Sequence, residues 1–536
     1  MTRRAMTVIL VLISGASGCT KPVPGGPWKT DEHFVMNHRS SRVFAPQETV
    51  PAILYAVRAG ADSIDVDIRK TADGVLVCHH DEYVITRQVF GPIDALDWAT
   101  LARADVGLEF DPEFAGTRIL TFEEVVSLAA TNGVRFHLES KVGDSIADEV
   151  FRIIEKHQAM SLVTDVQGLP APESPSFRRV VFHAHTMERG GDDDRHWIRR
   201  QINRRAPRPF HLNMEDCRAL ADVLDRHPER RPVMFDVRPL PIPNRPAVKL
   251  PPSLQGLSNS QALAQIIEVV GRRDSTALPV LRQAATGGPA VIRAAAIWAL
   301  GCLEDRESFE LVARCASLDD EDAVVRRTAV WAVSELDTPE AVTALAAIVK
   351  SALVPKSGGR GDWTASIALT CLGRMKTASA VDVPTEVLRA RPANRYLTQA
   401  AAATLARLGR RGVGPLIACL DEDRPPHRRE LIWALIRLAP DSVGPVLDKL
   451  TQTDSDVVRT NCLRVVGYCE SLPGAAAGAV MDCLKSPAAE VRAEAAWVCG
   501  RQGYRQAIDR LRALGEDPDE DVRLDARQAL ERLGDR

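Results

Sequence analysis

The second half of this chain repeats one helical pattern, and that repeat restricts the possible folds more than any other feature. From an anchor residue, apolar or small residues recur at +4, +7, +8 and +11, which is one face of an α-helix. The anchors are Ile292, Val325, Thr364, Leu397, His427, Val458, Val491 and Val522. They lie 33, 39, 33, 30, 31, 33 and 31 residues apart, a period that predicts an α-solenoid of stacked helix pairs.

The period, together with openings such as Asp456-Val457-Val458-Arg459, resembles HEAT-type repeats of the short bacterial kind. This resemblance implies a long curved surface, whose usual role is to bind a protein partner. Four tryptophans stand at +6 in their repeats, where they either pack between helices or line a ligand-binding side of the stack. They are Trp298, Trp331, Trp433 and Trp497.

At 536 residues the chain is too long for one hydrophobic core, so further domains are expected. The proline-dense run at 239–252 is typical of a linker. A formal net charge of −3 over this length argues against nucleic acid as a partner. The predicted parts are a signal peptide at 1–19, a tether at 20–30, a first folded domain at 31–240, a linker at 241–258 and the solenoid at 259–536.

The N-terminus has the pattern of an export signal. Arg3 and Arg4 precede a short apolar run that is too short to span a bilayer, and small residues follow as far as Cys19. The sequence 16–19, Ala-Ser-Gly-Cys, looks like a bacterial lipobox with Cys19 as the lipidated residue. Plain cleavage or an uncleaved anchor are the alternatives. We therefore expect a lipoprotein held outside the cytoplasm on the cell envelope.

The residues that could perform catalysis are concentrated in the stretch 60–87. Apolar residues at 64, 66 and 68 alternate with Asp65 and Asp67, so a strand should bury its apolar face and direct both carboxylates to the other face. A turn and a second short apolar run then lead to His79 and His80, and His80 is expected, like Asp65 and Asp67, at the carboxyl end of a parallel strand. By alternation His79 should point away from His80 and be structural, and His137 should face the same side as Glu139. Carboxylates at one strand end and imidazoles at the next suggest a metal ion beside an acid/base group.

An ordered series of short motifs around this stretch resembles the glycerophosphodiester phosphodiesterase family. It comprises 37–39 Asn-His-Arg, 45–49 Ala-Pro-Gln-Glu-Thr, 60–62 Gly-Ala-Asp, 65–67 Asp-Val-Asp, 73–74 Asp-Gly, 80–81 His-Asp, Arg87 and 139–141 Glu-Ser-Lys. Each motif is weak alone, but their order over about a hundred residues is a strong signal.

The resemblance implies a (β/α)8 TIM-like barrel that hydrolyses glycerophosphodiesters to glycerol 3-phosphate and an alcohol. It implies three sets of site residues. One divalent cation, Ca²⁺ or Mg²⁺, would be held by Asp65, Asp67 and Glu139. The general acid and base would be His38 and His80, and the substrate phosphate would be bound by Arg39 and Lys141.

The chain departs from the family pattern at three positions. Ser40 replaces a glycine, Gln47 stands where a glutamate is usual and Glu48 follows it, and Asp65 replaces a glutamate. These changes leave two rival hypotheses open. One is a non-catalytic scaffold with a degenerate barrel, and the other is a phosphodiesterase for another lipid- or polymer-derived phosphodiester.

The remaining elements of the first domain are expected from local patterns. A strand at 34–37 and a helix at 50–59 should precede the site, and a capping box should open a helix at Thr121, with Glu124 as its partner. Later strands are expected at 134–138, 161–166, 179–183, 209–212 and 232–237. The segment 88–120 reads as a surface cap over the barrel mouth, and the cysteines of the repeats as buried thiols.

Overall fold

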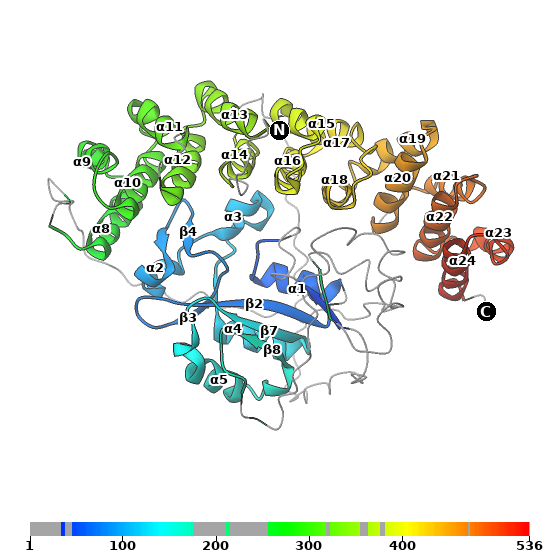
Figure 1. Ribbon diagram of the computed structural model, residues 1–536, viewed down its shortest axis with the longest axis horizontal. Coiled ribbons are helices and arrows are strands. Elements are labelled where there is room, and N and C mark those ends of the chain that lie inside the picture. The colour runs from blue at the N-terminus through cyan, green and yellow to red at the C-terminus, as the bar shows by residue number, and fades with distance from the viewer. Residues whose placement is uncertain are drawn as a thin grey trace, which may run out of the picture.

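The computed structural model describes residues 45–59, 61–172, 174, 254, 256–317, 322–353, 363–375, 381–469 and 472–534, together with the backbone of 34–37 and 211–214. In Figure 1 an α/β domain lies in the hollow of an arch of helices. Three predicted functional residues, Cys19, His38 and Arg39, lie outside the described residues, as do the strands expected at 179–183 and 232–237 and most of the linker. Their roles stay predictions.

Five strands of the α/β domain run parallel in the order β9–β1–β2–β7–β8. Their bounds are β1 Phe34–Asn37, β2 Ser63–Lys70, β7 Arg135–Ser140, β8 Val163–Gln167 and β9 His211–Met214. The strand expected at 34–37 is confirmed, and three others are found within two residues of their predicted positions. Among the described residues no strand joins β8 to β9, so they show a parallel α/β sheet without showing closure into a barrel.

A hairpin extends the sheet and corrects one prediction. Strand β3 (Leu76–Cys78) runs antiparallel to the last three residues of β2, and β6 (Leu120–Thr121) runs antiparallel to β3. The backbone N–H of Thr71 donates to the carbonyl of Val75 at 2.9 Å, which closes the turn between β2 and β3. Because a parallel return needs a crossover of about a dozen residues, so short a turn must give an antiparallel strand. The expectation that His80 follows a parallel strand is therefore wrong.

The three longest helices in the described part of this domain are α1 Val50–Arg58, α4 Phe122–Asn132 and α5 Ala147–Lys156. The capping box predicted for α4 is confirmed. The Thr121 hydroxyl accepts from the Glu124 N–H at 3.2 Å, and the Glu124 carboxylate accepts from the Thr121 N–H at 2.8 Å. This reciprocal pairing satisfies two backbone N–H groups and starts the helix directly after β6.

The solenoid follows the predicted repeat closely. Eight helices carry the eight anchors: α10 Ala290–Cys302, α12 Ala323–Glu335, α14 Thr364–Leu372, α16 Arg395–Arg407, α18 Pro425–Arg437, α20 Asp456–Tyr468, α22 Ala489–Arg501 and α24 Glu520–Arg532, with His427 and the other anchors at their starts. Between and before them lie α8 Asn259–Arg272, α9 Leu278–Ala284, α11 Phe309–Ser317, α13 Pro339–Leu353, α15 Asp382–Ala390, α17 Arg410–Ile417, α19 Val443–Gln452, α21 Ala476–Cys483 and α23 Ile508–Leu514. In Figure 1 the anchor helices line the inner side of the arch and the odd-numbered helices its outer side.

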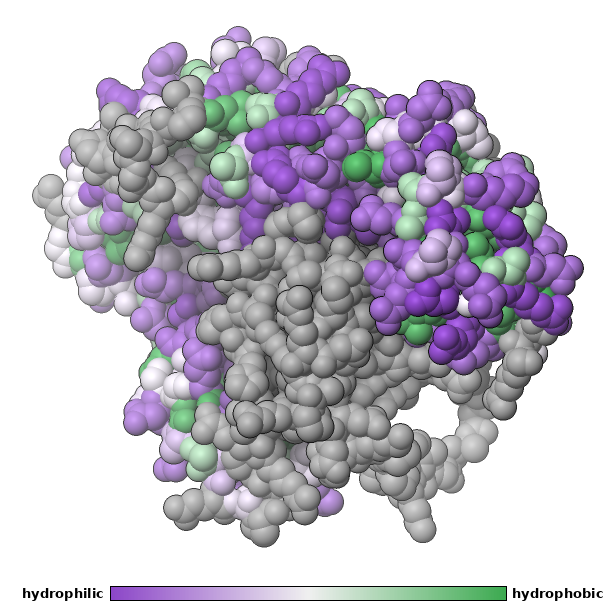
Figure 2. Space-filling model, turned by 45° about the vertical axis from the view of Figure 1, so that its right-hand side comes forward, coloured by the Kyte–Doolittle hydropathy of each residue, from purple (hydrophilic) through white to green (hydrophobic). Residues whose placement is uncertain are grey.

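The anchor register is the buried face of each repeat. In α20, for example, Cys462, Val465 and Val466 are fully buried. None of the nine described cysteines forms a disulfide, and burial raises the pKa of Cys462 to about 12, so the expectation of buried thiols is confirmed for that part of the chain. Hydrophilic side chains cover most of the described outer surface of the arch (Figure 2). None of the described helices combines the length and apolar composition that a membrane crossing requires.

The arch and the α/β domain meet at residues 86–111, here called the docking segment. Strands β4 (Tyr83–Ile85) and β5 (Phe90–Pro92) pair just at its start, and the short helices α2 (Trp98–Leu101) and α3 (Val106–Phe110) follow. Figure 1 shows β4 and α3 directly beneath the inner helices. Phe90 is fully buried and stacks on Trp298 of α10, with ring centroids 5.8 Å apart. The expectation of a surface cap is therefore wrong for this segment.

Several repeats contribute a side chain from the C-terminal half of an inner helix to the docking segment. Trp298 Nε1 donates to the Thr86 carbonyl at 2.8 Å, and Glu335 of α12 pairs with Arg87 at 2.6 Å. Arg437 of α18 pairs with Asp111 at 3.0 Å. Residues of the repeated inner helices thus make a row of contacts along the docking segment. The inner side of these repeats therefore binds a segment of the same chain.

Candidate active site

Strand β2 sets two carboxylates side by side. Asp65 and Asp67 alternate along it with apolar residues, and all of residues 64–68 are buried. Because successive side chains in a strand point to opposite faces, the two aspartates share one face of the sheet. They lie within β2 and not at its end, but Asp67 is next to the last residue of β2 that pairs with β7. Beyond that point β2 continues only into the hairpin.

Strand β7 brings a third carboxylate level with the second. The parallel register aligns Asp65 with His137 and Asp67 with Glu139. Residues aligned across neighbouring strands place their side chains on the same face, so β2 and β7 together present a row of four polar side chains. Sequence alternation predicted that Glu139 and His137 share a face, and the register agrees. Only the pairing of β2 with β7 puts them beside the aspartates.

Lys141 joins the carboxylates of the two strands. Its Nζ lies 2.9 Å from Asp67 Oδ1 and 2.5 Å from Glu139 Oε1, and its backbone N–H donates to the β2 carbonyl of Ile68 at 3.0 Å. Burial by itself would lower the pKa of Lys141, but the hydrogen bonds to Glu139 and Asp67 outweigh it and raise that pKa. The ammonium is therefore charged at neutral pH and stands between two anionic groups.

Glu48 is a further site residue, and no sequence pattern predicted a role for it. It is 2% exposed, and its Oε1 accepts from the backbone N–H of Asp67 at 2.5 Å. Its φ of 55° lies in the left-handed region, where a non-glycine residue is uncommon. The available signal was the carboxylate that stands one residue later than the family pattern. In the fold Glu48 is a third buried acidic residue beside Asp65 and Asp67, and its carboxylate holds the backbone of Asp67 in place.

The antiparallel strand β3 brings the histidines to this edge of the sheet. The backbone N–H of His79 donates to the Asp67 carbonyl at 3.0 Å, so His80 is the next residue along. The Arg69 guanidinium donates to the carbonyl of His80 at 2.8 Å and fixes the start of the loop. His80 is partly exposed, and its Nδ1 lies 2.9 Å from Asp81 Oδ1. A carboxylate that accepts from Nδ1 of an imidazole favours the tautomer in which Nε2 can take up a proton.

The two neighbouring histidines are buried in the domain. Burial lowers the pKa of His79, which supports its predicted structural role. Burial also lowers the pKa of His137, against an opposing effect from Asp165, and His137 Nε2 lies 4.0 Å from Asp65 Oδ1. Both rings are therefore neutral at pH 7. His80 is the histidine of this group with solvent access.

The donors for a cation are present, but they are not gathered into one group. Among the described residues, no three His, Cys, Asp or Glu side chains come together as a cluster that could hold a metal ion. Asp67 Oδ2 is buried and has no hydrogen-bond partner there, and Lys141 occupies the space between Asp67 and Glu139. A buried carboxylate oxygen without a donor fits a hard cation such as Ca²⁺ or Mg²⁺.

Comparisons with known proteins match two parts of the chain. Residues 38–166 match the glycerophosphoryl diester phosphodiesterase family. The predicted resemblance is confirmed for this segment. Residues 278–355 and 477–536 match HEAT repeats, which confirms the second predicted resemblance. The phosphodiesterase-family segment contains every described site residue named above, from Glu48 to Lys141.

Individual relatives cover the chain only in part. A glycerophosphodiester phosphodiesterase of Caldanaerobacter subterraneus is 34% identical over 111 residues, which are 20% of this chain and 46% of that protein. One of Bacillus subtilis is 22% identical over 168 residues, 29% of this chain and 56% of that protein. The crystal structure of a glycerophosphodiester phosphodiesterase from Agrobacterium tumefaciens aligns with 35% of this chain and 99% of its own, at 22% identity and a TM-score of 0.29. The chain thus spans about half the length of these two sequence relatives.

Proposed function

We propose that the chain is a metal-dependent phosphodiesterase that hydrolyses glycerophosphodiesters to glycerol 3-phosphate and an alcohol. The observation that carries the proposal is the cluster of Asp67, Glu139 and Lys141 on two adjacent parallel strands, inside the segment that matches the family. Buried and partly buried charges of both signs near the ends of two adjacent strands are arranged for binding a charged substrate more often than for stability.

The cation would be held by Asp65, Asp67 and Glu139. When bound, it neutralises charge on the phosphoryl oxygens and so favours attack at phosphorus. Glu48 holds the backbone of Asp67 through the 2.5 Å hydrogen bond, which keeps that carboxylate in position. Lys141 shares oxygens of both Asp67 and Glu139, so its ammonium is placed to donate to a phosphoryl oxygen next to the cation.

Acid/base chemistry is assigned to His80 and His38. Hydrolysis breaks the bond from phosphorus to the alcohol oxygen and forms one to the oxygen of water, so a proton must leave the nucleophile and another must reach the departing alkoxide. Asp81 accepts from His80 Nδ1, and that arrangement presents Nε2 for one of these transfers. The second transfer is assigned to His38, and Arg39 is assigned to the phosphate, from the family resemblance alone.

The rest of the predicted setting belongs to the same proposal. The pairing of β9 beside β1, on the side away from β2, supports a sheet that curls back on itself as a (β/α)8 barrel does. The lipobox-like sequence ending at Cys19 supports export and a lipid anchor outside the cytoplasm. Membrane lipids would then be a nearby source of glycerophosphodiesters.

The test is release of glycerol 3-phosphate by the full chain from glycerophosphocholine, with and without EDTA. Asp67→Asn removes a buried carboxylate charge and should reduce turnover by at least about a hundredfold, because it weakens binding of the cation and leaves the Lys141 ammonium with one anionic partner fewer. His80→Ala should cause a loss of about 10²–10⁴-fold. The matched control is Asp148→Asn, an exposed aspartate on α5, which should leave turnover unchanged.

The outcomes separate the rivals. Turnover that EDTA abolishes and both site variants impair supports the proposal. Binding of Ca²⁺ or Mg²⁺ without turnover on any of several phosphodiesters would favour the non-catalytic scaffold. Turnover confined to a lipid headgroup or a polymer-derived phosphodiester would keep the site and change the substrate. Full activity of Asp67→Asn in EDTA would refute the assigned centre.

A further inference from the structure

A cavity lies in the solenoid, and no residue of β2 or β7 lines it. It has a volume of about 330 Å³ and runs between α14, α16 and α18, where the docking segment closes one end with Glu109 and Phe110. Its α16 wall is built from residues spaced like one helical face, from Tyr396 through Gln399 and Ala403 to Arg407. Eleven residues of helix rise about 16 Å, so the cavity is an elongated groove, here called the solenoid groove. Its volume is in the range of about 300–1,000 Å³ typical of small-molecule sites.

Aromatic side chains form much of the groove wall. Trp363 and Tyr396 meet at one end with ring centroids 4.4 Å apart, and Phe110 and Trp433 line it further along. Trp363 is 44% exposed, although large apolar side chains elsewhere in the described chain are almost all covered. An exposed tryptophan at the mouth of an aromatic groove is typical of a surface that a ligand covers.

Two polar groups in the groove wall lack partners. Arg407 Nη1 and Ser366 Oγ are buried and have no hydrogen-bond partner among the described residues. Arg407 uses Nη2 to donate to the main-chain oxygen of Glu109 at 3.2 Å. Because a buried polar group without a partner costs about 1–3 kcal/mol, and more when charged, a cavity that contains two of them favours a ligand with a polar end.

The charges around Arg407 define the sign and size of that polar end. Four carboxylates at or near the groove are paired with four guanidinium groups. Glu109 pairs with Arg374, Glu335 with Arg374 and Arg87, Asp111 with Arg437 at 3.0 Å, and Glu430, which lines the groove, with Arg429 at 2.9 Å. None of the described carboxylates forms an ion pair with Arg407. Burial and the nearby Arg374 lower the pKa of Arg407 to about 10, so it is still a cation at neutral pH. The surroundings therefore leave one positive charge to be balanced by a single negative one.

We propose that the solenoid groove binds a single-chain amphiphile with a carboxylate head, with the head on the Arg407 guanidinium and the alkyl chain along the aromatic wall toward Trp363. A planar monoanion matches both the fork of the guanidinium and the one uncompensated charge. The apolar wall excludes water from the chain. This function is independent of phosphodiester hydrolysis and is assigned to the repeats together with the end of the docking segment that lines the groove.

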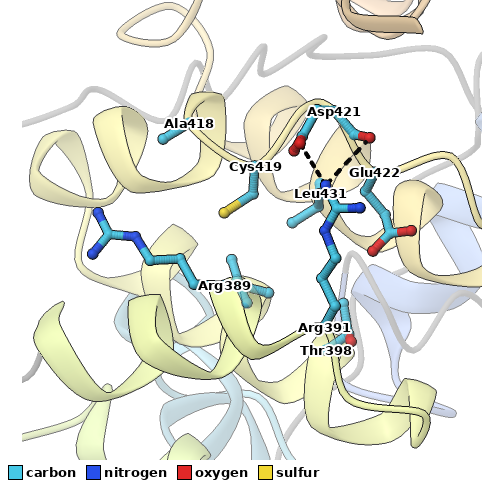
Figure 3. A pocket seen from close by; sticks show the side chains of 9 residues that line it. Arg389, Arg391, Thr398, Ala418, Cys419, Asp421, Glu422 and Leu431 are labelled. Atoms are coloured by element: carbon cyan, nitrogen blue, oxygen red, sulfur yellow. Dashed lines mark hydrogen bonds and ion pairs between the residues drawn. The ribbon is translucent and has the colours of Figure 1, made fainter.

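The other described solenoid cavity does not compete for this role. It lies among α15, α16, α17 and the start of α18 and has a volume of about 160 Å³. Figure 3 shows its Arg391 turned toward Asp421, and the two form an ion pair at 2.5 Å. Arg389 also lines this cavity, but at about 160 Å³ the space is too small for an alkyl chain.

The test measures binding of sodium dodecanoate to the full chain by isothermal titration calorimetry, with dodecanol and dodecyl phosphate as comparison ligands. Wild type should bind one dodecanoate and prefer it to dodecanol by at least about tenfold, the gain from a charge-assisted hydrogen bond. In Arg407→Gln that preference should disappear. Ala403 is exposed and lines the groove, so Ala403→Trp should abolish binding by filling it. Ala347→Trp, at an exposed alanine on α13, is the matched control and should bind as wild type does.

Thermal unfolding of each variant shows whether it is folded. If Arg407→Gln is unfolded, Arg407→Lys tests recognition of the carboxylate head instead, because lysine keeps the positive charge but loses the two-pronged guanidinium. Ala403→Trp still tests whether the alkyl chain occupies the groove. The proposal is overturned by any of four results: no saturable binding to wild type, a preference for dodecanoate that survives in Arg407→Gln, unchanged binding in Ala403→Trp, or tighter binding of dodecyl phosphate than of dodecanoate.

Discussion

The contact between the docking segment and the solenoid centres on Glu109, and its replacement by glutamine is the sharpest test of that contact. The Glu109 carboxylate pairs with Arg374 and accepts from Trp331 Nε1 at 3.2 Å, and Arg374 in turn pairs with Glu335 at 2.5 Å. The Glu109 and Arg374 side chains are about one-sixth exposed. The network joins α3 of the first domain to two consecutive repeats.

The expected loss follows from burial. Removing one partner of a buried ion pair destabilises a protein by about 3–5 kcal/mol, mainly because the other charge is left uncompensated. Glutamine keeps the shape and can still accept from Trp331. Burial also raises the pKa of Glu109, which means that desolvation already offsets part of its attraction to Arg374. We therefore expect the low end, about 3 kcal/mol, which corresponds to about a hundredfold faster opening of the docking segment.

Hydrogen–deuterium exchange of the backbone amides in the docking segment measures that opening without requiring the whole chain to unfold in two states. Glu109→Gln should accelerate exchange there, although Arg374 keeps its pair with Glu335, which is a further reason to expect the low end of the range. The control is Glu123→Gln, which removes an exposed ion pair with Lys156 and should change stability by less than about 1 kcal/mol. If Glu109→Gln exchanges no faster than this control, the reasoning about the network is wrong.

Three further outcomes are expected. Lys141→Met leaves the Asp67 and Glu139 carboxylates facing each other, so the protein in EDTA should lose about 3 kcal/mol of stability and melt at a lower temperature. Ca²⁺ should raise the melting temperature of this variant more than that of wild type. An equal rise in both would argue that the cation and the Lys141 ammonium do not share one position. Burial lowers the pKa of His427 in the folded state from its ordinary value of 6.5, so as the pH falls the unfolded chain takes up this proton before the folded chain does. The free energy of unfolding should therefore decrease as the pH drops below about 6.5. Urea titrations over this pH range should show a smaller decrease for His427→Leu than for wild type. A Cβ at Gly467 would lie 2.0 Å from the Trp497 ring, whereas one at Gly478 meets nothing, so Gly467→Ala should destabilise by about 1–3 kcal/mol while Gly478→Ala stabilises by about 0.5–1 kcal/mol in thermal melts.

The sequence by itself determined the local features of this protein. The eight anchors appear as eight inner helices because the pattern of one helical face depends only on neighbours three or four residues away. The capping box at Thr121 and the alternation around Asp65 and Asp67 are local for the same reason. The family segment was also evident, since its motifs are short and occur in a fixed order.

Only the tertiary structure decided which of these features meet. It paired β2 with β7, and it placed Glu48 on the backbone of Asp67, 19 residues away. It also joined Glu109 to Arg374, which are 265 residues apart in the chain. Contacts at such separations leave no period in the sequence, because each depends on the path of the whole chain between its partners. The local patterns therefore gave the elements and the residue types, and the packing of the arch on the docking segment gave their partners.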